Sequence, residues 1–240
     1  MLFRSETFGH RVALLTTLER RLELLAECGV EDVLVVEFTP EIAGLAPEDF
    51  ARNYLGAIGA HVVVAGTGFH FGRERAGDIE LLRSLGFDAR EVPLVEGISS
   101  TRIRQLAGAG EMEGAARLLG RPLELDGTVV PGDHRGGTLG FPTANLRVDP
   151  ALLVPEYGIY AGAVGDKRAA ISIGVNPHYG GAERRIEAYL LDWSGDLYGD
   201  RLVVELWRRL REERAFPSEA DLIDQIARDV ENTRSAIRPS

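Results

Sequence analysis

The segment RPLELDGTVV, residues 121–130, marks the point at which the organisation of the chain changes. From here to about residue 207, short apolar stretches are separated by the turn-forming residues Gly, Pro, Asn and Asp. This spacing is typical of antiparallel strands joined by turns. The stretches are LELDGTVV (123–130), IYAGAV (159–164), AAISIG (169–174), RIEAYLLD (185–192) and RLVVELW (201–207). Together they predict an antiparallel β-barrel or sandwich.

A closing helix is predicted after the last of these stretches. Ser218 and Asp221 have the spacing of a helix cap, and an apolar stripe follows at helical spacing. The stripe consists of Leu222, Ile223, Ile226, Ala227 and Val230. We expect this face of the helix to pack on the barrel.

The residues before 121 alternate helix and strand signals instead. A helix is predicted over residues 17–28, because Thr16 and Glu19 have capping-box spacing and Gly29 stands where a helix would stop. The runs VLVVEF (33–38) and HVVVAG (61–66) are apolar on both faces, as expected of strands buried in a parallel sheet. Further helices are predicted from Pro47 and near 78–85, 100–107 and 111–119, with a third strand near 89–95. The sequence therefore predicts an α/β domain over residues 1–120 and a β-barrel domain over 121–240.

Composition narrows the class of protein. The 240 residues are 45% hydrophobic and 27% charged, and no apolar run approaches the roughly 20 residues of a membrane span. The net charge of −10 argues against a nucleic-acid partner, because phosphate binding needs concentrated Lys and Arg. The first twenty residues lack the apolar core of a secretory signal, so a cytoplasmic location is expected. The single cysteine, Cys28, is expected to be a small buried side chain.

A glycine-rich loop follows the first predicted barrel strand. The segment VPGDHRGGTLGFPTAN, residues 130–145, holds four glycines between 132 and 140. Glycines let the backbone approach a ligand closely, so that amide N–H groups can face phosphate oxygens. Glycine spacing alone nevertheless favours an ordinary hairpin loop over a phosphate site.

Three polar residues near this loop are candidates for chemistry. Thr143 and Asn145 point to the same side if the segment is extended, and their oxygens suit Mg²⁺ beside phosphate. On local evidence an ordinary pair of turn residues is equally compatible. Glu187 lies on the opposite face of its strand from Ile186 and Ala188, either as a solvated residue or as a positioned general base. Periodicity does not decide between these two roles.

Four longer motifs resemble the riboflavin kinase module of the bacterial bifunctional riboflavin kinase/FAD synthetase family. They are GDHRGGTLGFPTANL, IGVNPHYGG, RRIEAYLLDWSGDLYG and RLREERAFPSEADLIDQIARDV, and they cover the chain from about Arg121 to its end. The PTAN element, followed some forty residues later by a strand Glu and SGDLYG, is the specific signature. The resemblance implies a β-barrel with a C-terminal helix that phosphorylates riboflavin to FMN with ATP and Mg²⁺.

The resemblance also implies roles for individual residues. Glu187 would be the catalytic base, and Thr143 and Asn145 would hold Mg²⁺ with the nucleotide. The nucleotide would bind to Gly132, Arg135, Gly136, Gly137, Pro142, Thr143 and Asn145, with Gly132 to Gly137 forming a flap over the phosphates. The flavin would approach the loop around Asp196, Leu197 and Tyr198 and the segment from Arg211 to Phe216.

The N-terminal half resembles the FMN adenylyltransferase domain of the same family, an incomplete Rossmann-like nucleotidyltransferase domain in this chain. The specific motif is ISSTRIR, residues 98–104. Its Ser99, Ser100 and Thr101 would open a helix suited to phosphate, and Arg104 would add positive charge. An ordinary Ser/Thr helix cap is the alternative that such residues form most often.

The family's adenylyltransferase domain carries two histidines spaced His-x-x-His in a glycine-rich turn. Here Phe8-Gly9-His10 is only superficially similar, because Thr7 stands where the first histidine would be. We therefore expect FAD synthesis to be absent or very weak. A bifunctional enzyme that also adenylylates FMN is the first alternative, and a non-catalytic flavin- or nucleotide-binding module is the second. Riboflavin and ATP are the expected partners, without nucleic acid, membrane or an obligate protein partner.

Overall fold

The structure, a computed structural model, describes residues 12–132, 141–175 and 184–240. The chain forms two compact units, one of Met1–Val12 with Asp32–Ile98 and the other of Ala13–Glu31 with Ser99–Ser240. This division differs from a single boundary after residue 120, because the second unit also includes residues from before that point. The reason is packing: Leu106, Met112 and Ala115 belong to the same core as the barrel strands.

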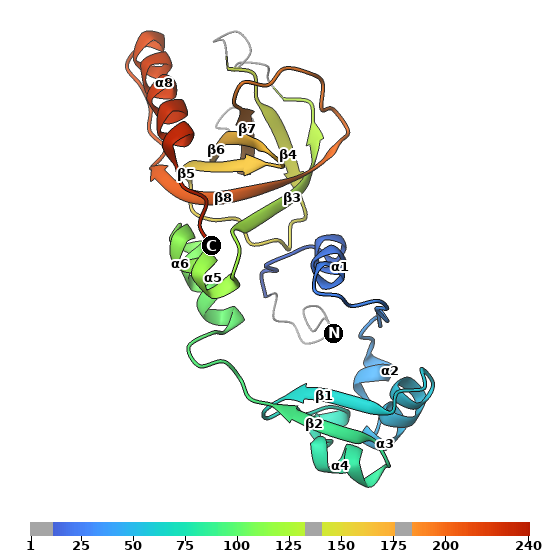
Figure 1. Cartoon of the computed structure of the whole chain (residues 1–240). Helices are drawn as coiled ribbons and strands as arrows, with labels where there is room; N and C mark the ends of the chain where they lie inside the picture. The colour runs from blue at the N-terminus through green and yellow to red at the C-terminus, as the bar shows by residue number, and fades with distance from the viewer. Residues whose placement is uncertain (1–11, 133–140, 176–183) are drawn as a thin grey trace. The chain divides into compact units, whose positions relative to one another are not determined.

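The second unit contains a closed six-stranded barrel (Figure 1). Its strands are β3 (Leu123–Val130), β4 (Ala144–Val148), β5 (Gly158–Val164), β6 (Lys167–Val175), β7 (Arg184–Leu190) and β8 (Arg201–Arg211). They pair antiparallel in the order β3-β4-β7-β6-β5-β8, and β8 closes the barrel on β3. The predicted antiparallel barrel is confirmed, with β4 as a strand in addition to the five stretches predicted from apolar patterning.

The barrel core is built by residues that alternate along each strand. On β7, Ile186, Ala188 and Leu190 are buried inside the barrel, whereas Glu187 and Tyr189 point to its outer face. Each fully buried Leu or Ile side chain contributes about 1.5–3 kcal/mol, so the interior supplies the main stabilisation of this unit. The alternation leaves the outer face of β4, β6 and β7 available for polar residues.

Three further helices of the second unit accompany the barrel. They are α1 (Leu18–Glu27), α5 (Ser100–Gly108) and α6 (Met112–Leu119). The predicted helix at 17–28 is confirmed, but its cap is Thr17 rather than Thr16, since Thr17 Oγ1 accepts a hydrogen bond from the Arg20 amide. The helix ends before Gly29, whose φ of 82° is readily adopted only by glycine.

The closing helix, α8 (Glu219–Ser235), is capped by Ser218 as predicted and lies beside β5 and β6 (Figure 1). Its fully buried residues are polar, namely Gln225, Asp229 and Thr233. The predicted apolar stripe is only partly covered, and Ala227 is exposed. Leu222 and Ile226 of this stripe line a cavity between the helix and the barrel instead of being buried against the strands.

The first unit is a small α/β unit. Its parallel strands are β1 (Val62–Gly66) and β2 (Asp88–Val92), and its helices are α2 (Pro40–Ala43), α3 (Pro47–Phe50) and α4 (Ile79–Ser84). A π-helical turn, Ala51–Gly56, continues α3, and a 3-10 turn spans Arg73–Arg75. Ala51, Phe71, Leu82 and Ala89 form the core of this unit.

Three predictions for the N-terminal residues are wrong. Residues 33–38 form no strand, and Val33, Leu34 and Val35 are exposed. Strand β1 is covered on one face only, because Val62 and Val64 on its other face are also exposed. Both differences follow from the sheet, in which the described residues provide only two paired strands. Cys28 is exposed rather than buried, because it caps the end of α1.

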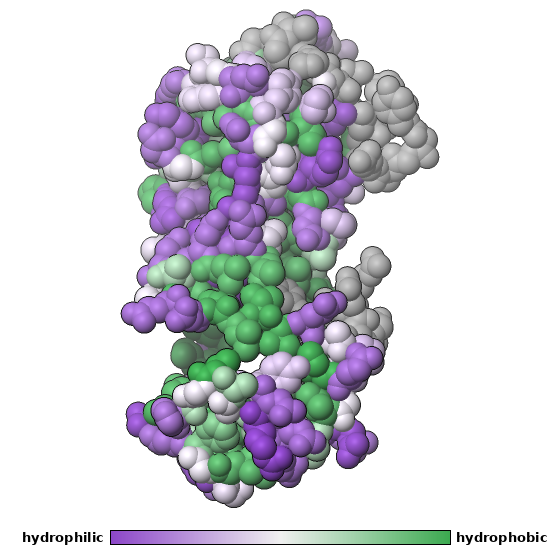
Figure 2. All heavy atoms as spheres, turned by 90° about the vertical axis from the view of Figure 1, so that its right-hand side faces the viewer, coloured by the Kyte–Doolittle hydropathy of each residue, from purple (hydrophilic) through white to green (hydrophobic). Residues whose placement is uncertain are grey.

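Figure 2 shows apolar residues, drawn in green, gathered in patches on the face of the molecule that is turned toward the viewer. No helix among the described residues is both long and apolar enough to cross a membrane.

Candidate active site

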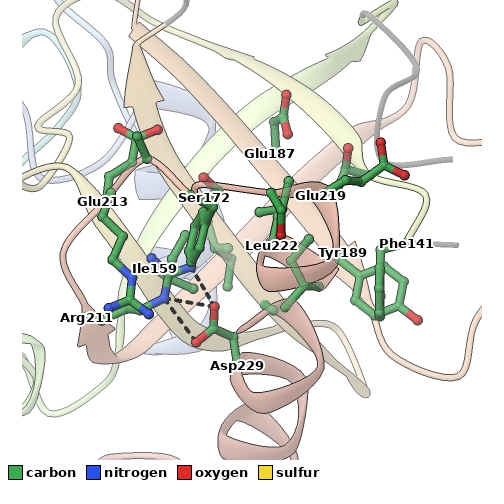
Figure 3. Close-up of a pocket in the computed structure, with 18 of the residues that line it drawn as sticks. Phe141, Ile159, Ser172, Glu187, Tyr189, Arg211, Glu213, Glu219, Leu222 and Asp229 are labelled. Atoms are coloured by element: carbon green, nitrogen blue, oxygen red, sulfur yellow. Dashed lines mark hydrogen bonds and ion pairs between the residues drawn. The ribbon is translucent and has the colours of Figure 1, made fainter. Parts of the chain in front are cut away.

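A cavity of about 720 Å³ lies between the outer face of the barrel and the segment that connects β8 to α8 (Figure 3). Strands β6 and β7 provide one wall, and residues 211–219 with the first turns of α8 provide the other. Much of the lining is apolar or aromatic, namely Phe141, Ile159, Ile171, Tyr189, Phe216, Leu222 and Ile226. Polar side chains interrupt this lining, and those on the strands β6 and β7 include Ser172 and Glu187, while Glu213, Glu219 and Asp229 lie on the opposite wall.

A row of three polar side chains crosses the wall of strands. Asn145 on β4 is directly opposite Glu187 on β7, and Glu187 is directly opposite Ser172 on β6. Directly opposite residues point to the same face of a sheet and lie about 5 Å apart. The barrel register therefore brings Asn145, Glu187 and Ser172 together on its outer face.

Glu187 is half-buried at the centre of this row. Its side chain is 27% exposed, and Arg185 Nη1 donates a hydrogen bond to its Oε1 at 3.3 Å. Arg185 lies two residues earlier on the same strand, so both side chains point to the outer face. The carboxylate is thus held in place while part of it faces the cavity.

The segment after β8 is fixed to α8 by a buried carboxylate. Arg211 donates from Nε and Nη2 to the two oxygens of Asp229, with its shortest contact at 2.7 Å (Figure 3). Gln225 also donates to Asp229, and it accepts a hydrogen bond from Arg214 at 2.6 Å. The guanidinium groups of Arg211 and Arg214 both lie over the ring of Phe216. These contacts position the segment that forms the outer wall of the cavity.

Glu213 is a further carboxylate of the cavity. Burial raises the pKa of Glu213, and although Arg211 and the Val175 amide act in the opposite direction, the nearby charge of Glu187 raises it further. The net pKa lies above the ordinary value for a glutamate. The carboxylate of Glu187 is therefore near enough for its charge to act on Glu213.

A smaller cavity, of about 300 Å³, lies at the other side of Thr143. It is lined by Pro142, Thr143, Asn145 and by Asp196, Leu197 and Tyr198 of the loop after β7. Thr143 lines both cavities, so they adjoin at this residue. Gly132 lies against Asn145: a Cβ at Gly132 would be only 2.0 Å from Asn145 Nδ2.

The residues at this junction fit the requirements of a magnesium ion held together with a nucleotide. The hydroxyl of Thr143 and the carboxamide of Asn145 offer hard oxygen donors, and Mg²⁺ typically keeps several waters and phosphate ligands besides one or two protein groups. No cluster of three or more His, Cys, Asp or Glu suited to a metal occurs in the described parts of the chain. An ion here would thus depend on phosphate oxygens for much of its coordination.

The predicted site residues are only partly brought together. Thr143, Asn145 and Glu187 lie around the junction of the cavities, whereas Arg135, Gly136 and Gly137 lie outside the described residues. The predicted flavin-binding residues do not line one cavity. Arg211 and Phe216 line the larger cavity, and Asp196, Leu197 and Tyr198 line the smaller one.

The predicted phosphate-binding motif in the N-terminal half has local structural roles. Ser99 caps α5 by accepting a hydrogen bond from the Arg102 amide, and Ser100 and Thr101 begin the helix. Arg104 Nε donates to the carbonyl of Ala13 at 2.7 Å.

Sequence reasoning missed several residues of the site. Ser172, Arg185 and Asp229 were not among the candidates, although all three line the larger cavity or contact a residue that does. Glu213 lies within the segment from Arg211 to Phe216 that is expected to approach the flavin, but it was not singled out there. Arg185 could have been found, because it shares the outer face with Glu187 at a spacing of two. The others depend on strand register and on the packing of α8.

Comparisons with known proteins match both halves of the chain. The family model described as riboflavin kinase matches residues 119–237, and the model described as FAD synthetase matches residues 4–104. The bifunctional riboflavin kinase/FMN adenylyltransferase of Listeria monocytogenes is 36% identical over 237 residues, covering 94% of this chain and 76% of the relative. The enzyme of the same description from Escherichia coli is 38% identical, covering 90% of this chain and 74% of its own length.

A solved structure is also similar over most of the chain. It is described as a macrolide-efflux protein from Streptococcus pneumoniae, and it is 34% identical to this chain with a TM-score of 0.81. The similarity covers 93% of this chain and 76% of the other.

Proposed function

Because the chain belongs to the bifunctional riboflavin kinase/FMN adenylyltransferase family, we propose that its barrel unit phosphorylates riboflavin to FMN with ATP and Mg²⁺. The observation that carries this proposal is the row of Asn145, Glu187 and Ser172, next to Thr143 where the two cavities adjoin. A base and a metal-binding pair on neighbouring strands are what transfer of a phosphoryl group to an alcohol needs.

The two cavities suit the two substrates. The larger one, with its aromatic and aliphatic lining, fits the fused ring system of a flavin, and Glu187 faces it. The smaller one contains Asn145 and adjoins Gly132 at the start of the glycine-rich loop, so we assign it to the nucleotide. This assignment moves Asp196, Leu197 and Tyr198 to the nucleotide side and leaves Arg211 and Phe216 on the flavin side.

Each residue near the junction then has a separate role. Thr143 and Asn145 would hold Mg²⁺ through their side-chain oxygens, and the ion supplies charge neutralisation at the phosphates. Glu187 orients the terminal hydroxyl of the ribityl chain and accepts its proton as the oxygen attacks the γ-phosphorus, and the bond from this phosphorus to the bridging oxygen breaks to release ADP. Arg185 keeps the Glu187 side chain in place. Arg211 acts through Asp229, by fixing the wall that bears Phe216.

A second candidate function is adenylylation of FMN to FAD. The match of residues 4–104 to the FAD synthetase family model favours it. The expectation that this activity is weak rests on Phe8-Gly9-His10, which resembles the family's histidine turn only superficially. Residues 1–11 lie outside the described residues, so the structure adds no contact at this position.

Product analysis tests both functions. Purified protein is incubated with riboflavin, ATP and Mg²⁺, and then in a second reaction with FMN in place of riboflavin. We expect FMN from the first reaction and little or no FAD from the second. Abundant FAD would establish a bifunctional enzyme, and a protein that binds riboflavin but yields neither product would be a non-catalytic binding module.

A further inference from the structure

Glu213 has no role in the proposed phosphoryl transfer, although its side chain lines the larger cavity together with Glu187 and Ser172 (Figure 3). Arg211, two residues away, gives its Nε and Nη2 donors to Asp229 and its Nη1 donor to the Glu212 carbonyl. The Arg211 donors are therefore directed to Asp229 and to the Glu212 carbonyl rather than to Glu213. Glu213 is exposed, so water can hydrate its carboxylate, and the hydroxyls of a substrate bound in the cavity can replace that water.

The position of the Glu213 carboxylate is set by the end of strand β6. Its atoms lie where a side chain of Gly174 would be, since a Cβ at Gly174 would be 2.4 Å from Oε1 and 2.6 Å from Oε2. The nearby Val175 amide acts to lower the pKa of this carboxylate. The absence of a side chain at Gly174 thus makes room for the Glu213 carboxylate.

The distance between the two carboxylates can be followed along the strands. Glu187 is directly opposite Ser172, and Gly174 is two residues further along the same face of β6. Two residues of a strand span about 7 Å, so the Glu213 carboxylate lies roughly that far from the row of Glu187 and Ser172. A short extended polyol chain can therefore reach from one carboxylate to the other along this face.

From this geometry we infer that Glu213 is a specificity-determining residue. Its carboxylate accepts hydrogen bonds from secondary hydroxyls of the ribityl chain, while Glu187 binds the terminal hydroxyl. The inference rests on the proposed function, because it takes riboflavin as the occupant of the larger cavity. It predicts that the enzyme recognises the polyol chain as well as the flavin ring, and that Glu213 provides much of this recognition.

The test compares riboflavin with a flavin whose N10 substituent is a 5-hydroxypentyl chain. This analogue keeps the terminal hydroxyl and lacks the three secondary ones. We expect the wild type to prefer riboflavin in kcat/KM. In Glu213→Gln this preference should fall about 10-fold, the usual effect of losing a hydrogen bond to a charged group, with little change for the analogue.

Two further variants separate recognition from folding. Gly174→Ala keeps the charge of Glu213 but places a methyl group against its carboxylate, so it should lower the same preference. Glu212→Gln is the matched control, because Glu212 is an exposed neighbouring carboxylate that does not line the cavity. Its preference should equal that of the wild type.

Quenching of flavin fluorescence measures binding of both flavins without turnover. Loss of preference in Glu213→Gln, in binding and in kcat/KM, supports the inference. An unchanged preference, or an equal fall for both flavins, overturns the role of Glu213 while FMN formation by the wild type still stands. A wild type that forms no FMN overturns the proposed function, and the inference with it.

Discussion

At the scale of single residues, the site depends on which face of a strand each side chain occupies. Glu187 and Tyr189 point outward from the barrel, whereas their neighbours Ile186 and Ala188 are buried. A carboxylate on the outer face remains accessible to substrate, and the strand backbone holds it in place through its ladder of hydrogen bonds. The strand therefore fixes the backbone of Glu187, although the side chain itself is flexible.

The first prediction concerns Glu187. Glu187→Gln keeps the shape of the side chain but removes the proton acceptor, so kcat for FMN formation should fall by about 10²–10⁴-fold. Riboflavin binding, followed by fluorescence quenching, should change little. Near-normal turnover would show that Glu187 is not the base. Glu231→Gln, an exposed change on α8, is the control and should leave both quantities unaltered.

The second prediction concerns the pair at the junction of the cavities. Thr143→Ala or Asn145→Ala removes one oxygen donor, so more Mg²⁺ should be needed for half-maximal activity and ATP should bind more weakly. Titration of FMN formation against Mg²⁺ at fixed ATP measures the effect. Asn232→Ala, an exposed asparagine on α8, serves as control. A magnesium requirement that does not change in either cavity variant would remove Thr143 and Asn145 from the metal site.

At the scale of elements, charged side chains join α1 to strands β3 and β8. Arg20 donates to both oxygens of the buried Glu124, at 2.9 and 3.0 Å, and Arg201 on β8 donates to both oxygens of Asp126. The Thr17 hydroxyl, at the cap of α1, also donates to Asp126. Buried charges are tolerated only when they are paired in this way. The network therefore fixes α1 on the barrel although α1 has no buried residue of its own.

The third prediction tests this network through its pH dependence. Burial alone would raise the pKa of Asp126, but hydrogen bonds from Arg201 and Thr17 outweigh it and the pKa is lowered. A lowered pKa in the folded state means that the stabilisation is fully present above the ordinary aspartate pKa of about 3.9 and is lost as the pH falls through the folded value. Asp126→Asn should reduce the free energy of unfolding by about 1–3 kcal/mol at pH 7.

Urea unfolding at pH 7 and below pH 4 measures this contribution. The difference between wild type and Asp126→Asn should shrink as the pH falls, because protonated Asp126 resembles the asparagine. Asp166→Asn is the control, since Asp166 is exposed and pairs only with the adjacent Lys167, and it should alter stability by less than about 0.5 kcal/mol. A difference that stays constant with pH would mean that the charge of Asp126 contributes nothing.

At the scale of the whole molecule, the barrel unit is assembled from two separate parts of the chain. Residues 13–31 belong to it although residues 32–98 form the other unit. The described residues that line the two cavities all come from positions 129–229, so α1 contributes none of them. Helix α1 supports the barrel, and the chemistry lies elsewhere.

The fourth prediction follows from this separation. A fragment of residues 99–240 should still form FMN, because it contains every described residue of both cavities. It should melt at a lower temperature than the whole chain, by about 2–4 °C for each kcal/mol of lost α1 contacts. Circular dichroism and FMN formation measure the two effects. A folded fragment without activity would show that α1 or the first unit takes part in the reaction.

The sequence alone determined the elements whose signals are local. Alternating apolar residues and turn residues predicted five of the barrel strands, and the cap at Ser218 predicted the start of α8, because these signals act between neighbours in the chain. The PTAN motif and the strand glutamate, through their family resemblance, indicated Thr143, Asn145 and Glu187 as the candidates for chemistry. The family itself was recognised from motifs and is confirmed by the relatives.

Only the tertiary structure decided which residues meet. Strand β4, short and preceded by the glycine-rich loop, has a weak apolar pattern, and its pairing with β7 is what places Asn145 opposite Glu187. Ser172 and Glu213 join the site through the register of β6 and through the segment before α8, which are contacts between residues far apart in sequence. Residues 33–38 show the converse case. Their apolar run predicts a buried strand, yet burial requires neighbouring strands on both sides, and no local pattern can provide them.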